Sequence, residues 1–423
     1  MQKFQLSKIG CSAYNSFAPR FELHLCFVLF LFLFFCALLV YFSFRSFLGG
    51  VAYLAYFRQQ LAKQPSSFTP FATVIAPCKD LDEGLRDNLT ALLKLDYPEY
   101  EVIFVVNNAN DPAVAEIEAV LNPRDTEAGK NKLIVAPTAT DSSQKVENLR
   151  EAVTHADPRS EIFVFVDSDA RPQKGWLRYL VAPLETEEVG AATGYRWFLS
   201  EKPTFAGELR SAWNASIASA LGPNTKSNFC WGGSTAIRRE VWEILDLRER
   251  LKGTVSDDFT ITRAMNEANL DIRFVPQALT PSIENCTVRE LFEFTTRQMK
   301  ITRVYRTELW AVSFFGSALF AGVMLTAFLI VLFSRSNSWT VLSAIATLAI
   351  VSGLSVGKAW LRLKAVSLVI PAASDQALTQ STLWLLAPPL FLWNCIVALF
   401  SRKISWRGIR YRLVSPKQTI RLN

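Results

Sequence analysis

The sequence predicts an α/β domain with a mostly parallel sheet, joined to transmembrane α-helices. Two observations lead to this fold class. Apolar residues gather at 23–44 and over most of 309–400, while the middle of the 423-residue chain has the composition of a globular domain. Within that middle part, short β-branched runs alternate with amphipathic segments, which is the pattern of βαβ units.

The first apolar segment is expected to be a membrane anchor at 23–48, after an N-terminal tail at 1–22. Residues 23–44 contain no Asp, Glu, Lys or Arg. At ~1.5 Å per residue they can cross roughly 30 Å of hydrocarbon. A cleaved signal peptide would have a shorter apolar run and a small-residue cleavage site, and a buried core helix would be less rich in Phe. Residues 49–70, which end in the polar stretch QLAKQPSSFTP, are expected to be a linker.

The domain at 71–306 should open with a strand, followed by a helix from near Asp82 and a second strand. The expected strands are the apolar runs FATVIAP at 71–77, YEVIFVV at 100–106, KLIV at 132–135 and EIFVFV at 161–166. In open α/β sheets, ligands bind beyond the carboxyl ends of the strands. The polar residues at those ends are therefore the first candidates for chemistry.

Membrane segments are expected again in the region 307–400. Residues 309–333 and 339–357 are almost free of charge and long enough to span a bilayer. The short polar link between them predicts a helical hairpin.

A third apolar segment, residues 383–400, raises a conflict over topology. Pro388 and Pro389 would break or kink it. Three full crossings would put the basic tail at 401–423 opposite the middle domain, whereas the positive-inside rule keeps both in the cytoplasm. We therefore favour a kinked or re-entrant third segment.

Charge and cysteine content exclude several classes of protein. The net charge of +7 is concentrated near the hydrophobic segments and in the tail, which suits anionic lipid headgroups, and no nucleic-acid partner is expected. Seven cysteines show no C-x-x-C spacing. This argues against a disulfide framework or a zinc site and fits a reducing compartment.

Asp167 and Asp169 directly follow the strand expected at 161–166. Carboxylates in that position suit Mg²⁺ or Mn²⁺, which prefers oxygen ligands and can bridge the diphosphate of a bound nucleotide. Taken alone, a D-x-D triplet is at least as often a turn or a helix cap.

Asp257 and Asp258 stand at the start of an amphipathic helix. For Asp257 we favour helix capping and a favourable interaction with the helix dipole. Asp258 is the candidate general base, because transfer to a hydroxyl requires a group that removes the acceptor proton. The two histidines are poor substitutes, since His24 lies in the anchor and His155 precedes the strand at 161–166.

Basic residues gather just before the second membrane region. At helical spacing, Arg297, Lys300 and Arg303 would share a face near the headgroups. Two interpretations stay open: anchoring to lipid phosphates, or contact with the diphosphate of a bound donor.

Together these features resemble glycosyltransferase family 2, and its ceramide glucosyltransferase branch, family 21, in particular. The resemblance implies a GT-A-like domain at 71–306 that faces the cytoplasm, in a multi-pass integral membrane protein. It covers most of the chain and is carried by PCKDLDEGLRDNL at 77–89, LDYPEYEV at 95–102, NDPA at 110–113, DSDA at 167–170, SDD at 256–258 and ISWRGIRYRL at 404–413.

The family motifs imply roles for five residues near the donor. Asp111 is expected to contact the nucleotide, with Lys145 and Asn148 beside it. Asp167 matches the aspartate at the donor and metal site. Asp169 supplies a second acidic residue, which the ceramide branch often lacks, so a bound Mg²⁺ or Mn²⁺ is expected.

The resemblance also implies that Asp258 is the base. Arg297 matches the start of the family's (Arg or Gln)-x-x-Arg-Trp element and is expected at the donor. Lys300 and Ile301 stand where Arg-Trp would follow. Lys300 keeps the positive charge of the motif and is also expected at the donor. Ile301 removes the indole of the motif, which affects how the acceptor would fit.

The implied activity is inverting transfer of a sugar, most simply glucose, from a UDP-sugar to a lipid hydroxyl, with a ceramide-like acceptor favoured. The alternatives are a hopanoid or other lipid glycosyltransferase, a processive polysaccharide synthase, and a non-catalytic membrane protein that binds a nucleotide sugar. A synthase needs a translocation channel. The chain has only three C-terminal apolar segments and no clear Gln-x-x-Arg-Trp motif, which makes a synthase less favoured. Binding alone would not require a base at Asp258.

Overall fold

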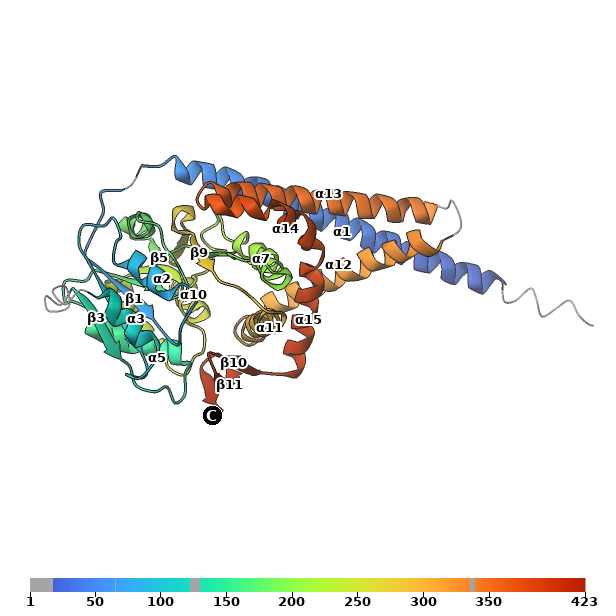
Figure 1. Ribbon diagram of the computed structural model, residues 1–423. Coiled ribbons are helices and arrows are strands. Elements are labelled where there is room, and N and C mark those ends of the chain that lie inside the picture. Colours follow the sequence, from blue (N-terminus) through green and yellow to red (C-terminus); the bar gives the residue numbers. More distant parts are fainter. Residues whose placement is uncertain (1–17, 65, 122–129, 335–338, 423) are drawn as a thin grey trace, which may run out of the picture.

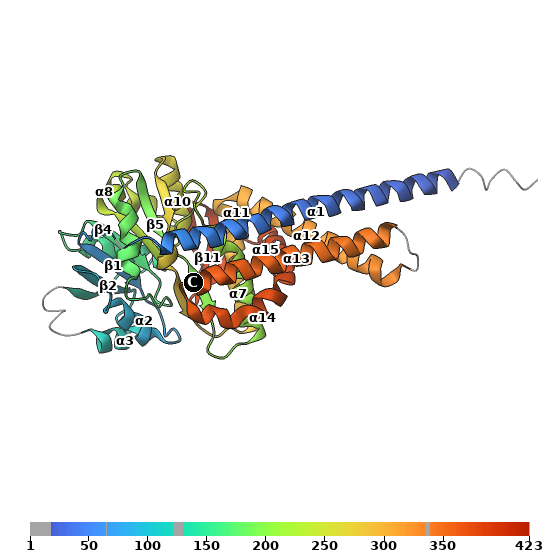
Figure 2. The same cartoon turned by 90° about the horizontal axis from the view of Figure 1, so that it is seen from above.

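The computed structural model describes residues 18–64, 66–121, 130–334 and 339–422, with side chains from residue 27 onward. An α/β domain stands at one end, and long helices extend away from it (Figures 1 and 2). Most of the tail expected at 1–22 lies outside the described residues.

A seven-stranded mixed sheet forms the centre of the domain, in the order β3-β2-β1-β4-β7-β5-β8. The first four strands in this order pair in parallel, as do β5 and β8, while β7 runs antiparallel to both of its neighbours. The predicted α/β fold class is therefore confirmed. The strands are β1 (Ala72–Pro77), β2 (Tyr100–Val106), β3 (Asn131–Val135), β4 (Ile162–Val166), β5 (Val189–Thr193), β7 (Ser234–Arg238) and β8 (Asp271–Phe274).

Helices cover both faces of the sheet, which explains why β1, β2 and β4 are continuous apolar runs rather than alternating ones. One apolar cluster joins the sheet to α2 (Leu85–Leu92), α3 (Ala113–Val120) and α6 (Trp176–Val181). The other joins it to α5 (Gln144–Ala152), α8 (Arg239–Ile244) and α10 (Asp257–Glu267). The helix expected from Asp82 begins three residues later, after Gly84 in the left-handed region.

Further elements lie between the sheet and the long helices. They are the paired strands β6 (Arg196–Leu199) and β9 (Thr280–Ile283), with α7 (Phe205–Ala218) and α11 (Val288–Tyr305), whereas α9 (Leu247–Arg250) packs with α8 and α10. Thr287 caps α11 in a capping box with Glu290.

Within the described residues, three helices are long and apolar enough to cross a membrane: α1 (Ala18–Leu61), α12 (Thr307–Phe333) and α13 (Trp339–Ser367). The linker expected at 49–70 is wrong in its first part, because α1 continues to Leu61. Aromatic side chains in this part give the helix a surface that packs on the domain. Tyr56 Oη donates to the carbonyl of Phe274 at 2.6 Å, and Phe57 is fully buried.

The third apolar segment is bent. Residues 371–385, which include α14 (Ala377–Thr382), meet α15 (Ala387–Phe400) at 57°. Pro388 and Pro389 lie in the first turn of α15, where a missing N–H costs least. The bend predicted from these prolines is present.

The basic tail is folded. Its strands β10 (Lys403–Trp406), β11 (Ile409–Ser415) and β12 (Gln418–Arg421) form an antiparallel sheet, here called the C-terminal ribbon. Its two-residue turn, Arg407-Gly408, has positive φ at both positions, as a tight hairpin turn requires. The ribbon lies against the domain near α11 (Figure 1). The tail and the domain therefore lie together.

Candidate active site

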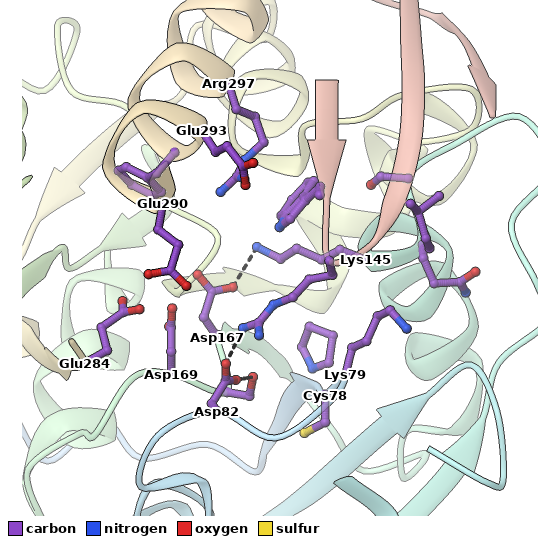
Figure 3. Close-up of a pocket in the computed structure, with 18 of the residues that line it drawn as sticks. Cys78, Lys79, Asp82, Lys145, Asp167, Asp169, Glu284, Glu290, Glu293 and Arg297 are labelled. Atoms are coloured by element: carbon purple, nitrogen blue, oxygen red, sulfur yellow. Dashed lines mark hydrogen bonds and ion pairs between the residues drawn. The ribbon is translucent and has the colours of Figure 1, made fainter. Parts of the chain in front are cut away.

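Two adjoining cavities lie beyond the carboxyl ends of β1 and β4. The first, the polar cavity, has a volume of about 300 Å³ (Figure 3). Its acidic lining residues are Asp82, Asp167, Asp169, Glu284, Glu290 and Glu293, and its basic ones are Lys79, Lys145, Arg196, Arg210, Arg297 and Arg407. Acidic and basic groups are equal in number, so the lining is close to neutral overall.

Ion pairs at the end of β4 hold Asp167. Lys145 Nζ lies 2.8 Å from Asp167 Oδ1 and 3.3 Å from Asp257 Oδ2. Arg196 bridges the D-x-D pair, at 2.7 Å from Asp167 Oδ2 and 3.1 Å from Asp169 Oδ2. Burial opposes ionisation of Asp167, but the two cations outweigh it and keep the pKa of that carboxyl below its ordinary value. Both oxygens of Asp167 are thus bound to cations.

The two predicted metal ligands, Asp167 and Asp169, differ in whether a carboxylate oxygen is left without a partner. Among the described residues, Asp169 Oδ1 is buried without a hydrogen-bond partner. No group of three or more His, Cys, Asp or Glu side chains in that part of the chain could hold a metal ion by itself. Mg²⁺ and Mn²⁺ at nucleotide sites often take only one or two carboxylates and use phosphate oxygens and water for the rest. Asp169 fits such an ion better than Asp167.

The second, or apolar, cavity has a volume of about 570 Å³ and contains Asp258 in its wall. Burial, followed by the nearby charge of Asp257, raises the pKa of Asp258 to about 7. The backbone N–H of Gly232 donates to Asp258 Oδ1. A Cβ at Gly232 would collide with the Asp257 carboxylate, so only glycine lets the backbone approach this closely. A carboxylate that titrates near neutrality is well matched to general-base chemistry.

The apolar cavity reaches from Asp258 to the long helices. Trp213 and Ile217 of α7 line it, as do Leu309 of α12 and Phe391 of α15. One continuous space therefore connects an ionisable carboxylate with the first turn of a helix of membrane-spanning length.

The two cavities meet at a shared wall. The residues that line both are Lys145, Asp167, Arg196, Phe294, Arg297, Gln298 and Trp406. A molecule in the polar cavity and one in the apolar cavity would thus meet beside the same charged cluster.

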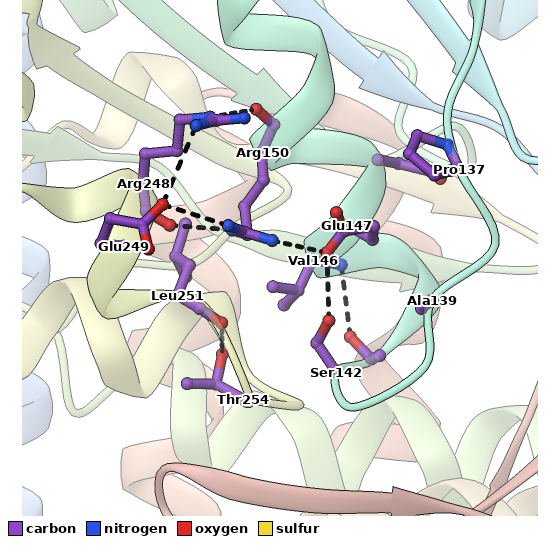
Figure 4. Close-up of polar contacts among 12 residues, drawn as sticks. Pro137, Ala139, Ser142, Val146, Glu147, Arg150, Arg248, Glu249, Leu251 and Thr254 are labelled. Atoms are coloured by element: carbon purple, nitrogen blue, oxygen red, sulfur yellow. Dashed lines mark hydrogen bonds and ion pairs between the residues drawn. The ribbon is translucent and has the colours of Figure 1, made fainter.

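Polar contacts fix α5, which carries Lys145 and Asn148 (Figure 4). Arg150 pairs with Glu147 at 2.8 Å, and its Nε donates to the carbonyl of Arg248 at 2.9 Å. Asn148 lines the polar cavity and accepts from Gln144 Nε2 at 2.9 Å. The helix that presents these two predicted donor residues is therefore tied to α9.

Two predicted site residues, Asp111 and Lys300, are not among the described residues that line either cavity. Asp111 accepts from the backbone N–H groups of Asp80 (2.9 Å) and Ala113 (3.0 Å), so its carboxylate organises a loop. Lys300 Nζ donates to the carbonyl of Lys403 at 2.8 Å and so holds the ribbon. Contact of either residue with a nucleotide stays a prediction.

Arg297, Lys300 and Arg303 do share a face of α11, but that face is turned to the C-terminal end of α15 and the segment after it. Arg303 donates to the carbonyl of Leu399 at 3.0 Å, which caps the end of α15. Arg297 donates to Ser405 O at 3.3 Å and also lines both cavities. Among the described residues it forms no ion pair. Burial, and then the charge of Arg407, lower its pKa to about 10.

Sequence reasoning missed Arg196, Asp82 and Arg407 as site residues. Asp82 accepts from Ser168 Oγ at 2.7 Å and pairs with Arg407 at 2.5 Å. The stretch ISWRGIRYRL at 404–413 contributed to the family resemblance but gave no indication of where it folds. Arg196 had no signal, because its partners Asp167 and Asp169 lie in the loop after β4, far from it in sequence.

The model of Glycosyl transferase family 21 matches residues 39–419. The mannosyltransferase PcManGT from Pyrobaculum calidifontis, solved with GDP-Man and Mn²⁺, is 20% identical, with a TM-score of 0.46 over 86% of this chain and 99% of that one. Glucosyl-3-phosphoglycerate synthase from Mycobacterium tuberculosis is 16% identical, with a TM-score of 0.31 over 55% and 79%. GalNAc-T7, solved with UDP, GalNAc and Mn²⁺, is 12% identical, with a TM-score of 0.41 over 59% and 52%.

The family match extends from within α1 to the last strand of the ribbon, and so includes the domain, the long helices and both cavities. As its motifs predict, the chain belongs to glycosyltransferase family 21.

Proposed function

We propose that the protein is a membrane-bound inverting glycosyltransferase that moves a sugar from a UDP-sugar, most simply UDP-glucose, to the hydroxyl of a ceramide-like lipid. One observation carries the proposal: a polar cavity and an apolar cavity share the wall that contains Asp167, and the apolar one continues to the long helices. A soluble donor suits the first cavity, and a lipid acceptor suits the second.

The donor diphosphate is assigned to the polar cavity. Because its acidic and basic groups balance, a diphosphate with about two negative charges needs further positive charge, and burying it unpaired would be costly. Arg297, one of those basic groups, forms no ion pair among the described residues and is assigned as a direct contact of the diphosphate. Mg²⁺ or Mn²⁺ held through Asp169 would neutralise charge on the leaving diphosphate. Lys145 and Asn148, with Asp111 behind them, are assigned to the nucleotide.

The acceptor is assigned to the apolar cavity, with its hydroxyl at Asp258 and its chains toward Leu309 and Phe391. Asp258 takes the hydroxyl proton as the oxygen attacks the anomeric carbon. The new carbon–oxygen bond forms on the face opposite the departing diphosphate, which leaves with the electrons of the old bond. One such displacement inverts the anomeric centre.

The ribbon bears on membrane topology. It contacts the domain through Tyr411, which accepts from the N–H of Gln144 at 3.1 Å. An even number of crossings must therefore separate the two. We assign the crossings to α12 and α13 and place the bent segment 371–400 at the surface, with the domain and the basic ribbon both in the cytoplasm.

The test uses the purified full-length protein in lipid nanodiscs with labelled UDP-glucose and a panel of ceramides and hopanoid alcohols. The expected product is a lipid with a single sugar of inverted anomeric configuration, absent with Asp258→Asn. A polymeric product would establish a polysaccharide synthase instead. Binding of UDP-glucose without turnover on any lipid would support a non-catalytic role.

A further inference from the structure

The turn of the C-terminal ribbon points to a second donor contact. We propose that the ribbon completes the donor site and that Arg407, which pairs with Asp82 in the structure, binds a phosphate of the nucleotide. The inference rests on the proposed nucleotide-sugar donor and adds a binding residue from the last strands of the chain.

The first support is the position of Arg407. Its guanidinium lines the polar cavity, 2.5 Å from Asp82 Oδ1. Asp82 is only 10% exposed and is also held by Ser168 Oγ, next to the D-x-D pair, whereas the Arg407 side chain is 37% exposed. Among the described residues, Asp82 is the polar partner of this side chain, and a guanidinium has five N–H donors. Arg407 therefore has donors to spare for a phosphate.

The second support is the backbone. Arg407 has φ of 49° and Gly408 has φ of 75°. Two-residue hairpin turns of this kind favour Asn-Gly, because Asn tolerates the left-handed region far better than a long side chain does. A turn that served only to reverse the chain would gain from Asn at 407. The arginine is instead kept at a strained position from which its side chain reaches the cavity.

The third support is that the ribbon is fixed at the site rather than loosely attached. Gln144, the neighbour of Lys145, donates its N–H to Tyr411 Oη, and Arg421 donates to the carbonyl of Ala139 at 3.0 Å. Trp406, next to the turn, lines both cavities and lies 5.5 Å from the Arg297 guanidinium. The turn thus brings Arg407 to the polar cavity, which Arg297 of α11 also lines.

The rival explanation is that Arg407 only fastens the ribbon to Asp82. The two roles predict opposite effects at Asp82. If the ion pair is a fastening, removing either partner is equivalent. If Arg407 binds phosphate, Asp82 competes with the ligand for the guanidinium and repels it, so removing Asp82 favours binding.

The experiment is UDP titration of the full-length protein in nanodiscs by calorimetry. Arg407→Asn should weaken UDP binding by about ten- to a hundredfold, the loss expected for a charged hydrogen bond, although it suits the turn better. Asp82→Asn should bind UDP at least as tightly as wild type. Arg412→Gln, which removes the same charge from the exposed face of β11, should bind as wild type does.

Thermal unfolding of each variant shows whether the ribbon has been lost. Arg407→Lys keeps the positive charge but lacks the forked guanidinium, so it should bind UDP with intermediate affinity. Wild-type affinity in Arg407→Asn would overturn the inference. So would an equal loss in Asp82→Asn and Arg407→Asn. Failure of the wild-type protein to bind UDP would be a different result, since it would overturn the proposed donor and this inference with it.

Discussion

Asp258 should set the pH dependence of turnover. Burial and the charge of Asp257 raise its pKa to about 7, and only the deprotonated carboxylate can take the acceptor proton. kcat/KM should therefore reach a plateau above pH 7 and fall about tenfold for each pH unit below it. Asp258→Asn should lower kcat by about 10²–10⁴-fold, the usual contribution of a general base.

The assay is single-sugar transfer to a ceramide acceptor in nanodiscs between pH 5.5 and 8.5, with UDP binding measured in parallel at each pH. Asp257→Asn is the paired variant, because it removes the like charge that acts on Asp258. Its falling limb should move to lower pH, since the deprotonated form of Asp258 is then easier to reach. UDP binding by Asp258→Asn should remain close to that of wild type.

Two results would refute this reasoning. A flat profile across the range would mean that no group titrating near neutrality controls the reaction. A limb that stays in place in Asp257→Asn would mean that another group produces it.

Three further predictions concern the donor, the acceptor and the metal. Arg297→Gln should raise KM for UDP-glucose about tenfold or more through loss of a charge-assisted contact, while an unchanged KM in steady-state kinetics would remove Arg297 from the donor site. Ala220→Trp, at an exposed position that lines the apolar cavity, should raise KM for the lipid and leave UDP affinity unchanged in titrations. If the variant had the same KM as wild type for both short-chain and long-chain ceramides, the acceptor assignment would be contradicted. Chelation should abolish turnover reversibly, and Asp169→Asn should raise the Mn²⁺ concentration that restores half of it, whereas an unaltered requirement would show that the metal binds elsewhere.

The sheet was predictable because its central strands are buried on both faces and therefore stand out as unbroken apolar runs. The position of the D-x-D pair in the site was predictable because the pair directly follows β4, and the carboxyl end of a parallel strand opens into the ligand crevice. These features could be predicted from short stretches of sequence, because each depends on residues that are neighbours along the chain.

What the sequence did not reveal depends on distant partners. Arg196 is 27 residues beyond Asp169 along the chain, and β9 lies between them by pairing with β6 and bridging to Ala170 through Ser282. Lys300 and Arg303 of α11 also donate to carbonyl groups at 398–403, a contact that no periodicity encodes. The helix through 49–61 was hidden because its aromatic side chains pack on the domain rather than forming a stripe against lipid.

The order of the chain makes the ribbon the last part of the polar cavity to be synthesised among the described residues. A ribosome delivers the sheet and α11 first, then the hydrophobic hairpin, and the strands that carry Trp406 and Arg407 last of all. N-terminal parts fold first during synthesis, so a nascent polypeptide has its D-x-D acids and Asp258 in place while one wall is still missing. The polar cavity therefore stays open on one side until the hairpin of α12 and α13 has been synthesised.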